Sequence, residues 1–511
     1  MSERGAVQLR AVTIARLYLP LAVIVTIAVV LRIVWLDRLP GINGDEAWQG
    51  ALAQRWAAGD LTLWRTPSGN FPGPIQTALV ALGQYVMPSE FVTLRIPTVI
   101  SSLAAMVIAW WIGRRHFDAA TGRIALMLMA TLPANIAFAR FGWDPSHSPL
   151  LVLGGIAVAL ERRLALMLSI YALALWNHPT NVFAAPLLLI AFAAAERPAA
   201  NNRLFAVRIS VAFTAMALAT AIMMATATQA GQFVNRADVM ARLVSPADWL
   251  TIVLLLGRTM AGEPWFVSLA GSSYGALLPL VDMVALSLLL GTTWFTIRTV
   301  TRDGLSLRGG LLLGWLAMVA SFALIGGSAA LTAPSERYAF VLVAPTAMGI
   351  AIAARSVLGR AAGTLREALA TATLGALLLA STIAFYLVPL ANRDATAHMA
   401  FRTGPVEPKE AAARWISAEA RRAPIRLITE NWWLHWPLAY RLAGQPVVVV
   451  DAEKQPLEAL RETPLRTIDV VFAGGPADRR LAVDPGARLT YTAQGYDGRA
   501  VVRLWERGLR P

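Results

Sequence analysis

The stretch Leu39-Pro-Gly-Ile-Asn-Gly-Asp-Glu-Ala-Trp-Gln-Gly50 follows directly on the first long apolar run of the chain, Leu17 to Leu36. Two adjacent carboxylates, Asp45 and Glu46, therefore stand where a lipid-embedded segment has just emerged into water. The rest of the sequence is best explained as membrane spans arranged around this loop.

Composition places the chain among membrane proteins. Of its 511 residues, 57% are hydrophobic and only 15% are charged, and the mean hydropathy is +0.55. A soluble globular domain needs only about half of its residues to be apolar. Apolar runs of the roughly 20 residues that cross a bilayer recur from Leu17 to Leu390. The sequence thus predicts a polytopic α-helical membrane protein with about eleven transmembrane helices.

The net charge of +14 does not indicate a nucleic-acid partner. The arginines stand in short clusters between apolar runs, which is the orientation signal of membrane topology. A nucleic-acid surface would gather its cations on one face. The chain has no cysteine, so no disulfide or thiolate metal site can be proposed. We expect membrane lipids, and no nucleic acid, among its partners.

Arginine clusters also predict the orientation of the spans. Arg4, Arg10 and Arg16 precede the first span and place the N-terminus in the cytoplasm. The first span is an uncleaved anchor that delivers Asp45 and Glu46 to the outer face of a bacterial cytoplasmic (inner) membrane. The predicted spans are, approximately, residues 17–36, 91–113, 121–139 and 148–160, two short spans between Arg163 and Arg197, and then 207–228, 276–296, 309–327, 339–354 and 368–390.

The predicted domains are a transmembrane domain, 1–391, and a periplasmic α/β domain, 392–511. Outer loop 37–90 of the first domain carries an amphipathic helix from Asp45 to Ala58, expected to lie in the membrane interface with its tryptophans at headgroup depth. A shorter apolar piece runs from Ile75 to Val86. In the second domain the pattern predicts a helix, Pro408–Arg421, and strands at Ile425–Thr429, Val447–Val450, Ile468–Phe472, Leu489–Tyr491 and Val501–Trp505.

The acidic pair admits two interpretations. Aspartate at the start of a helix is common in a solvated turn, and the pair would then only begin the helix that follows. Alternatively, a membrane-surface helix rimmed by Trp48 and Trp56 holds Asp45 and Glu46 at the mouth of a cavity between spans. A half-desolvated carboxylate there can have its pKa tuned to accept a proton from a hydroxyl.

Two arginines near the outer ends of spans are also candidates. Arg95 lies in the second span, where its side chain either snorkels to the headgroups or is turned inward by a helix distortion at Pro97. Arg140 stands four residues before Asp144, a spacing that also fits a local ion pair of little consequence at a surface.

Arg337 and Tyr338 stand together at the outer start of a late span. Arginine suits two-point binding of a phosphate, and tyrosine can steady it, although the same pair is also ordinary in the belt at a membrane surface. His178 ends the fifth span, where a lone histidine is more often structural. Asp282 lies within the eighth span, an unfavourable place for a carboxylate, and is expected to face the bundle interior.

These candidates share one side of the membrane. Acidic and basic groups gathered there suggest a site that handles a lipid-borne phosphate together with a hydroxyl or phosphate acceptor. A transporter more often places ionisable groups near the midplane of interrupted helices. The candidate site residues are Asp45, Glu46, Arg95, Arg140, Asp144, His178, Arg337 and Tyr338.

The pattern resembles the GT-C glycosyltransferases. Similarity to the protein O-mannosyltransferases (family 39) and the aminoarabinose-transferase-like group covers roughly residues 17 to 390. It rests on Asp45-Glu46-Ala47 in the first outer loop, Arg95-Ile-Pro97 in the second span, Arg337-Tyr338 and about eleven spans. The tail, with Glu430 to Tyr440, is similar to extracytoplasmic tails of uncharacterised bacterial members.

The resemblance implies an inverting transfer of a sugar from a polyprenyl-phosphate donor on the outer face. By the same resemblance, Asp45 is the general base, and Glu46 orients the acceptor or the base. Arg337, helped by Arg140, holds the leaving lipid phosphate, so that no nucleotide site is needed. No cofactor is required, although Asp45, Glu46 and Asp144 can supply hard oxygen ligands to a divalent cation.

The acceptor stays open between a protein, a lipid and a cell-envelope polysaccharide. Residues 229–275 are too short for the folded insertion of eukaryotic protein mannosyltransferases, and Trp48-Gln49 stands where aminoarabinose transferases carry Arg-Tyr. Two other functions also fit the sequence. One is a transporter or flippase of lipid-linked sugar intermediates, and the other is an assembly component whose outer domain recruits a partner.

Overall fold

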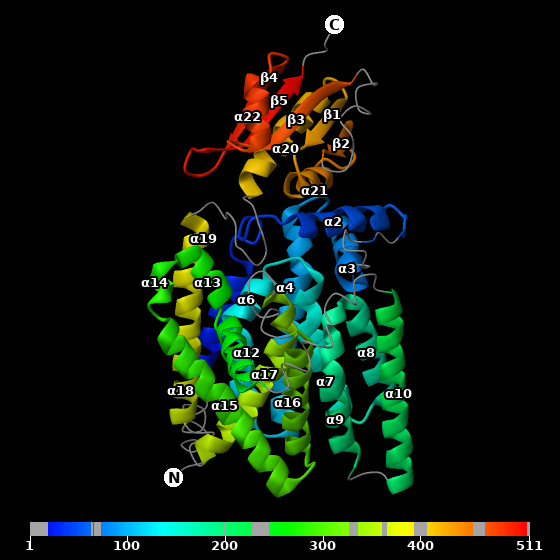
Figure 1. Ribbon diagram of the computed structural model, residues 1–511, viewed down its shortest axis with the longest axis vertical. Helices are drawn as coiled ribbons and strands as arrows, with labels where there is room; N and C mark the ends of the chain where they lie inside the picture. The colour runs from blue at the N-terminus through cyan, green and yellow to red at the C-terminus, as the bar shows by residue number, and fades with distance from the viewer. Residues whose placement is uncertain are drawn as a thin grey trace, which may run out of the picture.

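The computed structural model describes residues 19–62, 65, 73–197, 201–226, 245–326, 336–359, 365–392, 406–452 and 465–507. Figure 1 shows a bundle of long helices with a small α/β domain, formed by the C-terminal part of the chain, stacked on one end. We call this end of the bundle the domain end and the opposite one the far end.

Most of the bundle consists of helices that can cross a membrane. Within the described ranges, seven helices are long and apolar enough, or eight when the bent pair α5 and α6 counts as one span. The crossing window is only 11% buried in α10 and 17% buried in α15, so both present apolar side chains outward, as lipid requires. The seven are α4 (Phe91–His116), η2 (Pro179–Phe183) with α9 (Ala184–Glu196), α10 (Asn202–Thr226), α15 (Leu278–Asp303), α16 (Leu307–Gly326), α17 (Phe340–Leu358) with its preceding turn, and α18 (Leu365–Thr382) continued by η7 (Ile383–Leu387) and α19 (Val388–Asn392).

The remaining predicted spans are bent or short. α5 (Ala119–Thr131) and α6 (Pro133–Ala139) meet at 57°, because the proline at the start of α6 cannot continue the preceding helix. Each predicted span coincides with a helix. By length and composition alone, only seven or eight of the described helices qualify as membrane spans. Short helices can be accommodated by local thinning of the bilayer. They are Leu19–Ile33, α7 (Ser148–Leu160) and α8 (Leu164–Asn177).

Helix α2 (Gly44–Ala57) carries the acidic pair and lies across the domain end, beneath the α/β domain (Figure 1). The Asn43 side chain accepts the Asp45 N–H at 2.7 Å, and the Glu46 carboxylate accepts the Asn43 N–H at 3.4 Å, which together cap the helix. Trp48, expected at headgroup depth, is only 4% exposed. The prediction that Trp48 lies at headgroup depth is therefore wrong, because this side chain packs against the C-terminal domain.

In its described residues, 406–452 and 465–507, the C-terminal domain is a mixed sheet with three helices. Its five strands are in the order β2-β1-β3-β5-β4. β1 is parallel to β2 and β3, whereas β5 is antiparallel to β3 and β4. Every residue of β1 is buried, and each predicted strand coincides with an observed one. The elements are α20 (Val406–Ala420), β1 (Ile425–Thr429), α21 (Trp432–Arg441), β2 (Val447–Asp451), β3 (Arg466–Phe472), α22 (Pro476–Val483), β4 (Ala487–Gln494) and β5 (Ala500–Arg507).

Helix α17 occupies the centre of the bundle. Every residue from Phe340 to Ala353 is buried, as expected of a helix that is apolar all round. Arg337 and Tyr338 directly precede it, so the central helix fixes where this pair lies. The shorter elements of the bundle are α3 (Pro74–Gln84), η1 (Asp144–His147), α12 (Pro246–Met260), α13 (Glu263–Ala270), α14 (Ser272–Gly275) and η5 (Glu336–Ala339).

Candidate active site

Glu46 and Arg95 form a fully buried ion pair, with both side chains 0% exposed. The Nε of Arg95 donates to Glu46 Oε1 at 2.8 Å, and Nη2 donates to Oε2 at 3.0 Å. Oε1 also accepts the Gly142 N–H at 2.7 Å. A Cβ at Gly142 would lie 2.3 Å from the Leu94 carbonyl oxygen, so only glycine permits this approach. The pair thus ties the start of α2 to α4 and to the segment before η1.

Arg95 uses all of its N–H donors within the protein. Besides the two bonds to Glu46, it donates to the carbonyl oxygens of Leu36 at 2.9 Å, Pro40 at 2.8 Å and Gly41 at 3.1 Å. No donor remains for a lipid phosphate. The phosphate-binding role predicted for Arg95 is therefore corrected, because this guanidinium holds the segment that joins the first helix to α2.

Arg140 is likewise completely buried. Its Nη1 donates to the Leu31 carbonyl oxygen at 2.6 Å, and its Nη2 donates to those of Val34 and Leu39, both at 2.7 Å. These carbonyls end the first helix, where a cation is favourable. These bonds engage the guanidinium in place of the local ion pair with Asp144 that the spacing also allowed. Because it is buried, Arg140 is not placed to hold a lipid phosphate either.

Asp45 is the partly exposed member of the acidic pair. It lies in the first turn of α2, where the helix N-terminus favours a carboxylate. Its Oδ1 accepts a hydrogen bond from the indole N–H of Trp432, in α21 of the C-terminal domain, at 3.0 Å. Asp45, unlike Glu46, can therefore be reached from outside the protein.

Asp144 begins η1 and is 6% exposed. Its Oδ1 accepts from Gln49 Nε2, and its Oδ2 accepts from the Gly73 N–H at 2.8 Å. Burial raises the pKa of Asp144 to about 7; these two donors oppose the rise, and the charge of nearby Asp45 adds to it. Asp144 thus titrates in the neutral range beside a second, more accessible carboxylate.

Arg337 differs from the other two arginines because no backbone carbonyl of a described residue occupies it. Within the described part of the chain it makes one hydrogen bond, from Nη2 to the Tyr338 hydroxyl at 3.3 Å, and its Nε–H has no partner. Its guanidinium carbon lies 5.2 Å from the ring centre of Trp143 and 5.1 Å from that of Tyr338. Two aromatic faces thus hold the cation and leave N–H donors for an anion.

His178 belongs to the same aromatic cluster. Its ring stacks on Tyr338, with centres 6.0 Å apart, and meets Trp143 edge-on at 6.1 Å. Its Nδ1 is hydrogen-bonded with the Thr180 hydroxyl at 2.7 Å. Burial, together with the charge of Arg337, lowers the pKa of His178. The imidazole is therefore neutral, and it contributes an aromatic surface that packs against Trp143 and Tyr338.

Trp143 and Asp144 connect the two parts of the site. Trp143 contacts the Arg337 guanidinium, and Asp144, the next residue, is close enough to Asp45 to feel its charge. The acidic residues are therefore linked to the aromatic cluster around Arg337 through two adjacent residues of the chain. Five predicted residues belong to these two linked groups: Asp45, Asp144, His178, Arg337 and Tyr338. The other three, Glu46, Arg95 and Arg140, support the loop from within.

Three further residues next to these side chains were not predicted from the sequence: Gln49, Trp143 and Trp432. Gln49 is four residues after Asp45, so helical spacing alone would place both on one face. Trp143 is the neighbour of a predicted residue. Trp432 had no such signal, because 387 positions separate it from Asp45.

Asp282 is paired with a cation from another helix. Both of its oxygens accept hydrogen bonds from Arg258 of α12, at 2.5 Å from Nε and 2.5 Å from Nη2. The Asp282 side chain faces this neighbouring helix and is 25% exposed, so it is not fully buried. An ion pair rather than burial in the bundle explains this carboxylate in an apolar helix.

A metal ion has no ready-made site in the part of the chain that the structure describes. No group of three or more His, Asp or Glu side chains is placed there to hold one. Glu46, one of the three carboxylates offered as ligands, is bound by Arg95. A divalent cation at Asp45 and Asp144 stays a prediction.

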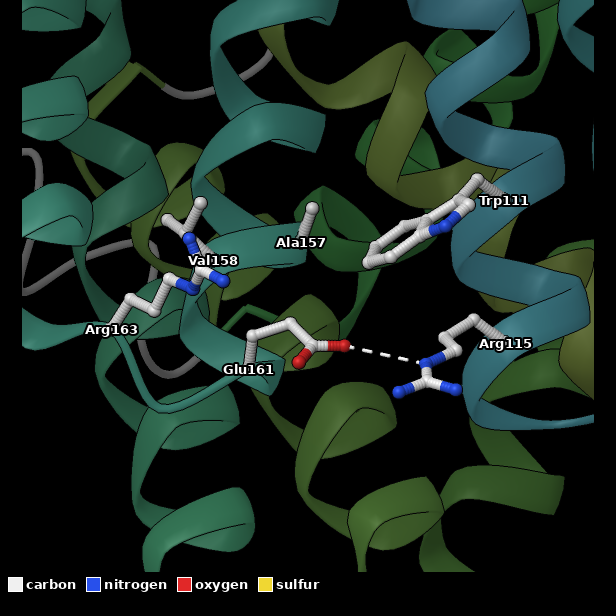
Figure 2. Close-up of a pocket in the computed structure, with 6 residues that line it drawn as sticks. All are labelled: Trp111, Arg115, Ala157, Val158, Glu161 and Arg163. Carbon is white, nitrogen blue, oxygen red and sulfur yellow. Dashed lines mark ion pairs between the residues drawn. The ribbon is translucent and has the colours of Figure 1, made fainter.

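A cavity of about 460 Å³ lies at the far end, between α4 and α7 (Figure 2). Trp111 and Arg115 of α4 face Glu161 and Arg163, and Arg115 Nε lies 3.5 Å from Glu161 Oε1. The whole of α7, roughly 20 Å at 1.5 Å per residue, separates this cavity from Asp144. It is therefore not part of the site around Asp45.

Solved structures share this architecture. ArnT from Cupriavidus metallidurans bound to undecaprenyl phosphate aligns with a TM-score of 0.52 at 13% identity, over 94% of this chain and 97% of that chain. An oligosaccharyltransferase from Archaeoglobus fulgidus in the apo form aligns with a TM-score of 0.51 at 13% identity, over 89% of this chain and 69% of that chain. The chain has the GT-C fold.

A further GT-C structure is the Archaeoglobus fulgidus oligosaccharyltransferase AglB in complex with an inhibitory peptide and a dolichol-phosphate. It aligns with a TM-score of 0.48 at 14% identity over 85% of this chain, which spans only 64% of that chain. No protein-family model and no curated protein sequence matches the chain. One fold can host different activities, so the function depends on the residues of the site.

Proposed function

We propose that this chain is an inverting glycosyltransferase that moves a sugar from a polyprenyl-phosphate donor to an acceptor on the outer face of the cytoplasmic membrane. The observation that carries the proposal is the accessible Asp45 carboxylate joined, through Trp143 and Asp144, to the Arg337 guanidinium. A candidate base and a candidate anion-binding group are thus linked through two adjacent residues. A solved structure with the same fold holds undecaprenyl phosphate.

The proposed reaction is a single displacement. Asp45 takes the proton from the acceptor hydroxyl while that oxygen bonds to the anomeric carbon. The bond from this carbon to the phosphate oxygen breaks in the same step, which inverts the anomeric centre. The electron pair leaves with polyprenyl phosphate, whose growing negative charge is stabilised by Arg337 and by the Tyr338 hydroxyl.

Glu46, Arg95 and Arg140 act on the reaction indirectly. Their buried bonds fix the segment that ends the first helix and begins α2, so the backbone at Asp45 is ordered before substrate arrives. Preorganisation of this kind is what a general base needs in order to meet its hydroxyl in one geometry. Of the three predicted arginines, only Arg337 is proposed to bind the phosphate.

Asp144 and His178 complete the walls of the proposed site. A carboxyl group that titrates near pH 7 can donate a hydrogen bond to a sugar or acceptor oxygen when it is protonated. His178, Trp143 and Tyr338 present ring faces beside the guanidinium. Apolar walls with a few placed polar groups are typical of small-molecule sites.

Arginines at the far end support the proposed orientation. Arg114 and Arg115 lie in the last turn of α4, and Arg355 lies in the last turn of α17. Cytoplasmic loops are enriched in such residues. The far end is then cytoplasmic, and the site and the C-terminal domain are periplasmic. The acceptor is any periplasmic protein, lipid or polysaccharide that offers a hydroxyl to Asp45.

A reconstituted transfer assay tests the proposal. The purified chain is placed in vesicles with a radiolabelled polyprenyl-phosphate sugar and an extract of cell-envelope acceptors. We expect release of polyprenyl phosphate and label in a product that carries a new glycosidic bond. Movement of intact donor across the bilayer without that bond would instead identify a flippase. Donor that is neither consumed nor moved would leave only the assembly role.

A further inference from the structure

Helix α21 of the C-terminal domain presents an aromatic face to α2. Trp432, Trp436 and Tyr440 recur every four residues and therefore share one side of the helix. Figure 1 places α21 directly above α2. The Trp436 ring meets Trp48 of α2 edge-on, with ring centres 6.4 Å apart, and Tyr440 is completely buried. The domain is thus packed onto the helix that carries Asp45.

Two glycines of α2 allow this close packing. A Cβ at Gly44 would lie 2.3 Å from Cδ1 of Trp432 and 2.5 Å from its Nε1. A Cβ at Gly50 would lie 2.8 Å from two ring carbons of Tyr440. The aromatic rings therefore rest directly on the backbone of α2, and the indole of Trp432 lies against the residue that precedes Asp45.

Polar contacts fix the other end of α21. The Tyr440 hydroxyl accepts from Gln84 Nε2 at 2.9 Å and donates to the Glu90 carbonyl oxygen at 3.0 Å. Arg441 Nη1 donates to the Ser89 carbonyl oxygen at 2.7 Å. Because these partners lie at the end of α3 and before α4, α21 is attached to the bundle along its length. Trp432 is held in place by the whole contact.

We propose that Trp432 is a positioning residue for Asp45, so that the C-terminal domain completes the active site. The indole N–H donates to Asp45 Oδ1 at 3.0 Å and fixes the rotation of the carboxylate. The same bond favours the ionised carboxylate, which is the form that accepts a proton. This inference rests on the proposed role of Asp45 as the base.

A purely structural Trp432 predicts a different result. If the indole only docks the domain, its loss lowers stability and leaves the pH profile of turnover unchanged. If it positions the base, the acidic limb of that profile must move, because this limb reports ionisation of the catalytic carboxylate. The pH profile therefore separates the two roles.

The test compares Trp432→Phe with Trp433→Phe in the full-length chain, in the vesicle assay with labelled donor. Trp432→Phe keeps an aromatic ring and removes the N–H. We expect kcat to fall about tenfold, the donor KM to stay unchanged and the acidic limb to rise by about one pH unit. The control alters the neighbouring tryptophan, whose indole makes no hydrogen bond to any described residue, and leaves the profile unchanged.

A second variant approaches the same bond from α2. Gly44→Ala places a methyl group where the Trp432 indole lies and should move the acidic limb in the same direction. If Trp432→Phe does not fold, the pH profile of Gly44→Ala tests the same hydrogen bond. An unmoved limb in the folded variants overturns the proposal for Trp432. A wild-type chain that transfers no sugar at any pH overturns the proposed function instead.

Discussion

Arg95 and Glu46 are joined by two hydrogen bonds, at 2.8 and 3.0 Å, in a position where neither side chain is exposed. The adjacent Asp45 remains accessible. Two neighbouring carboxylates thus have separate tasks: Glu46 supports the loop, and Asp45 is available for chemistry. Substitutions of the two kinds of residue should therefore have different effects on stability and on transfer.

Arg95→Leu should destabilise the chain strongly. The substitution leaves the Glu46 carboxylate buried without its cation, and breaking a buried pair in this way removes about 3–5 kcal/mol. The melting temperature in detergent measures the loss. Arg55→Leu is the matched control, because it breaks the exposed pair with Asp60 and should hardly change the melting temperature. Equal effects of the two substitutions would contradict the supporting role.

Asp45→Asn should abolish transfer and leave the fold intact. The amide keeps the shape of the side chain but cannot accept the proton, and general-base catalysis typically contributes about 10²–10⁴-fold. Product formation from labelled donor is the measurement, with the melting temperature as a check on folding. Full activity in this variant would remove Asp45 from the mechanism.

Arg337→Leu should mainly reduce turnover, whereas Arg140→Leu should mainly reduce stability. Loss of Arg337 removes the guanidinium held between Trp143 and Tyr338, and turnover should fall about 10²–10³-fold with little change in melting temperature. Loss of Arg140 removes four hydrogen bonds to backbone carbonyls and should lower the melting temperature. If Arg337→Leu retains normal turnover, another group binds the phosphate.

Asp144→Asn should flatten the dependence of stability on pH. The pKa of Asp144 is raised to about 7 by burial, against about 3.9 in an unfolded chain. Between these values the folded state holds a proton that the unfolded state has lost, so the free energy of unfolding falls as pH rises from about 4 to about 7. The variant lacks this group and should lose that decline.

Melting temperatures between pH 4.5 and pH 8 measure the Asp144 effect. Asp60→Asn serves as the control, because hydrogen bonds from Thr62 and Arg55 lower the pKa of Asp60 to about 2. Asp60 is then ionised in both the folded and unfolded states above about pH 5, so its contribution is constant over all but the lowest part of this range. A wild-type slope retained by Asp144→Asn would show that Asp144 is not the titrating group.

The sequence by itself determined the elements and their order. Apolar runs and arginine clusters are local, one-dimensional signals, and each predicted span and strand coincides with an element of the structure. The same signals placed the acidic pair in the loop after the first helix. These local signals could not show that α2 is covered by the C-terminal domain. In the sequence, Trp48 is consistent both with a position at the lipid headgroups and with a buried position.

Only the tertiary structure decided which charged groups are available. Whether an arginine meets a carbonyl or an open pocket depends on partners far away in the chain: Arg140 bonds to Leu31 across 109 positions, and Trp432 bonds to Asp45 across 387. A buried guanidinium has to find acceptors wherever the fold supplies them. Residue type and spacing do not reveal these long-range contacts. Only the folded chain therefore distinguishes the supporting residues from the reacting ones.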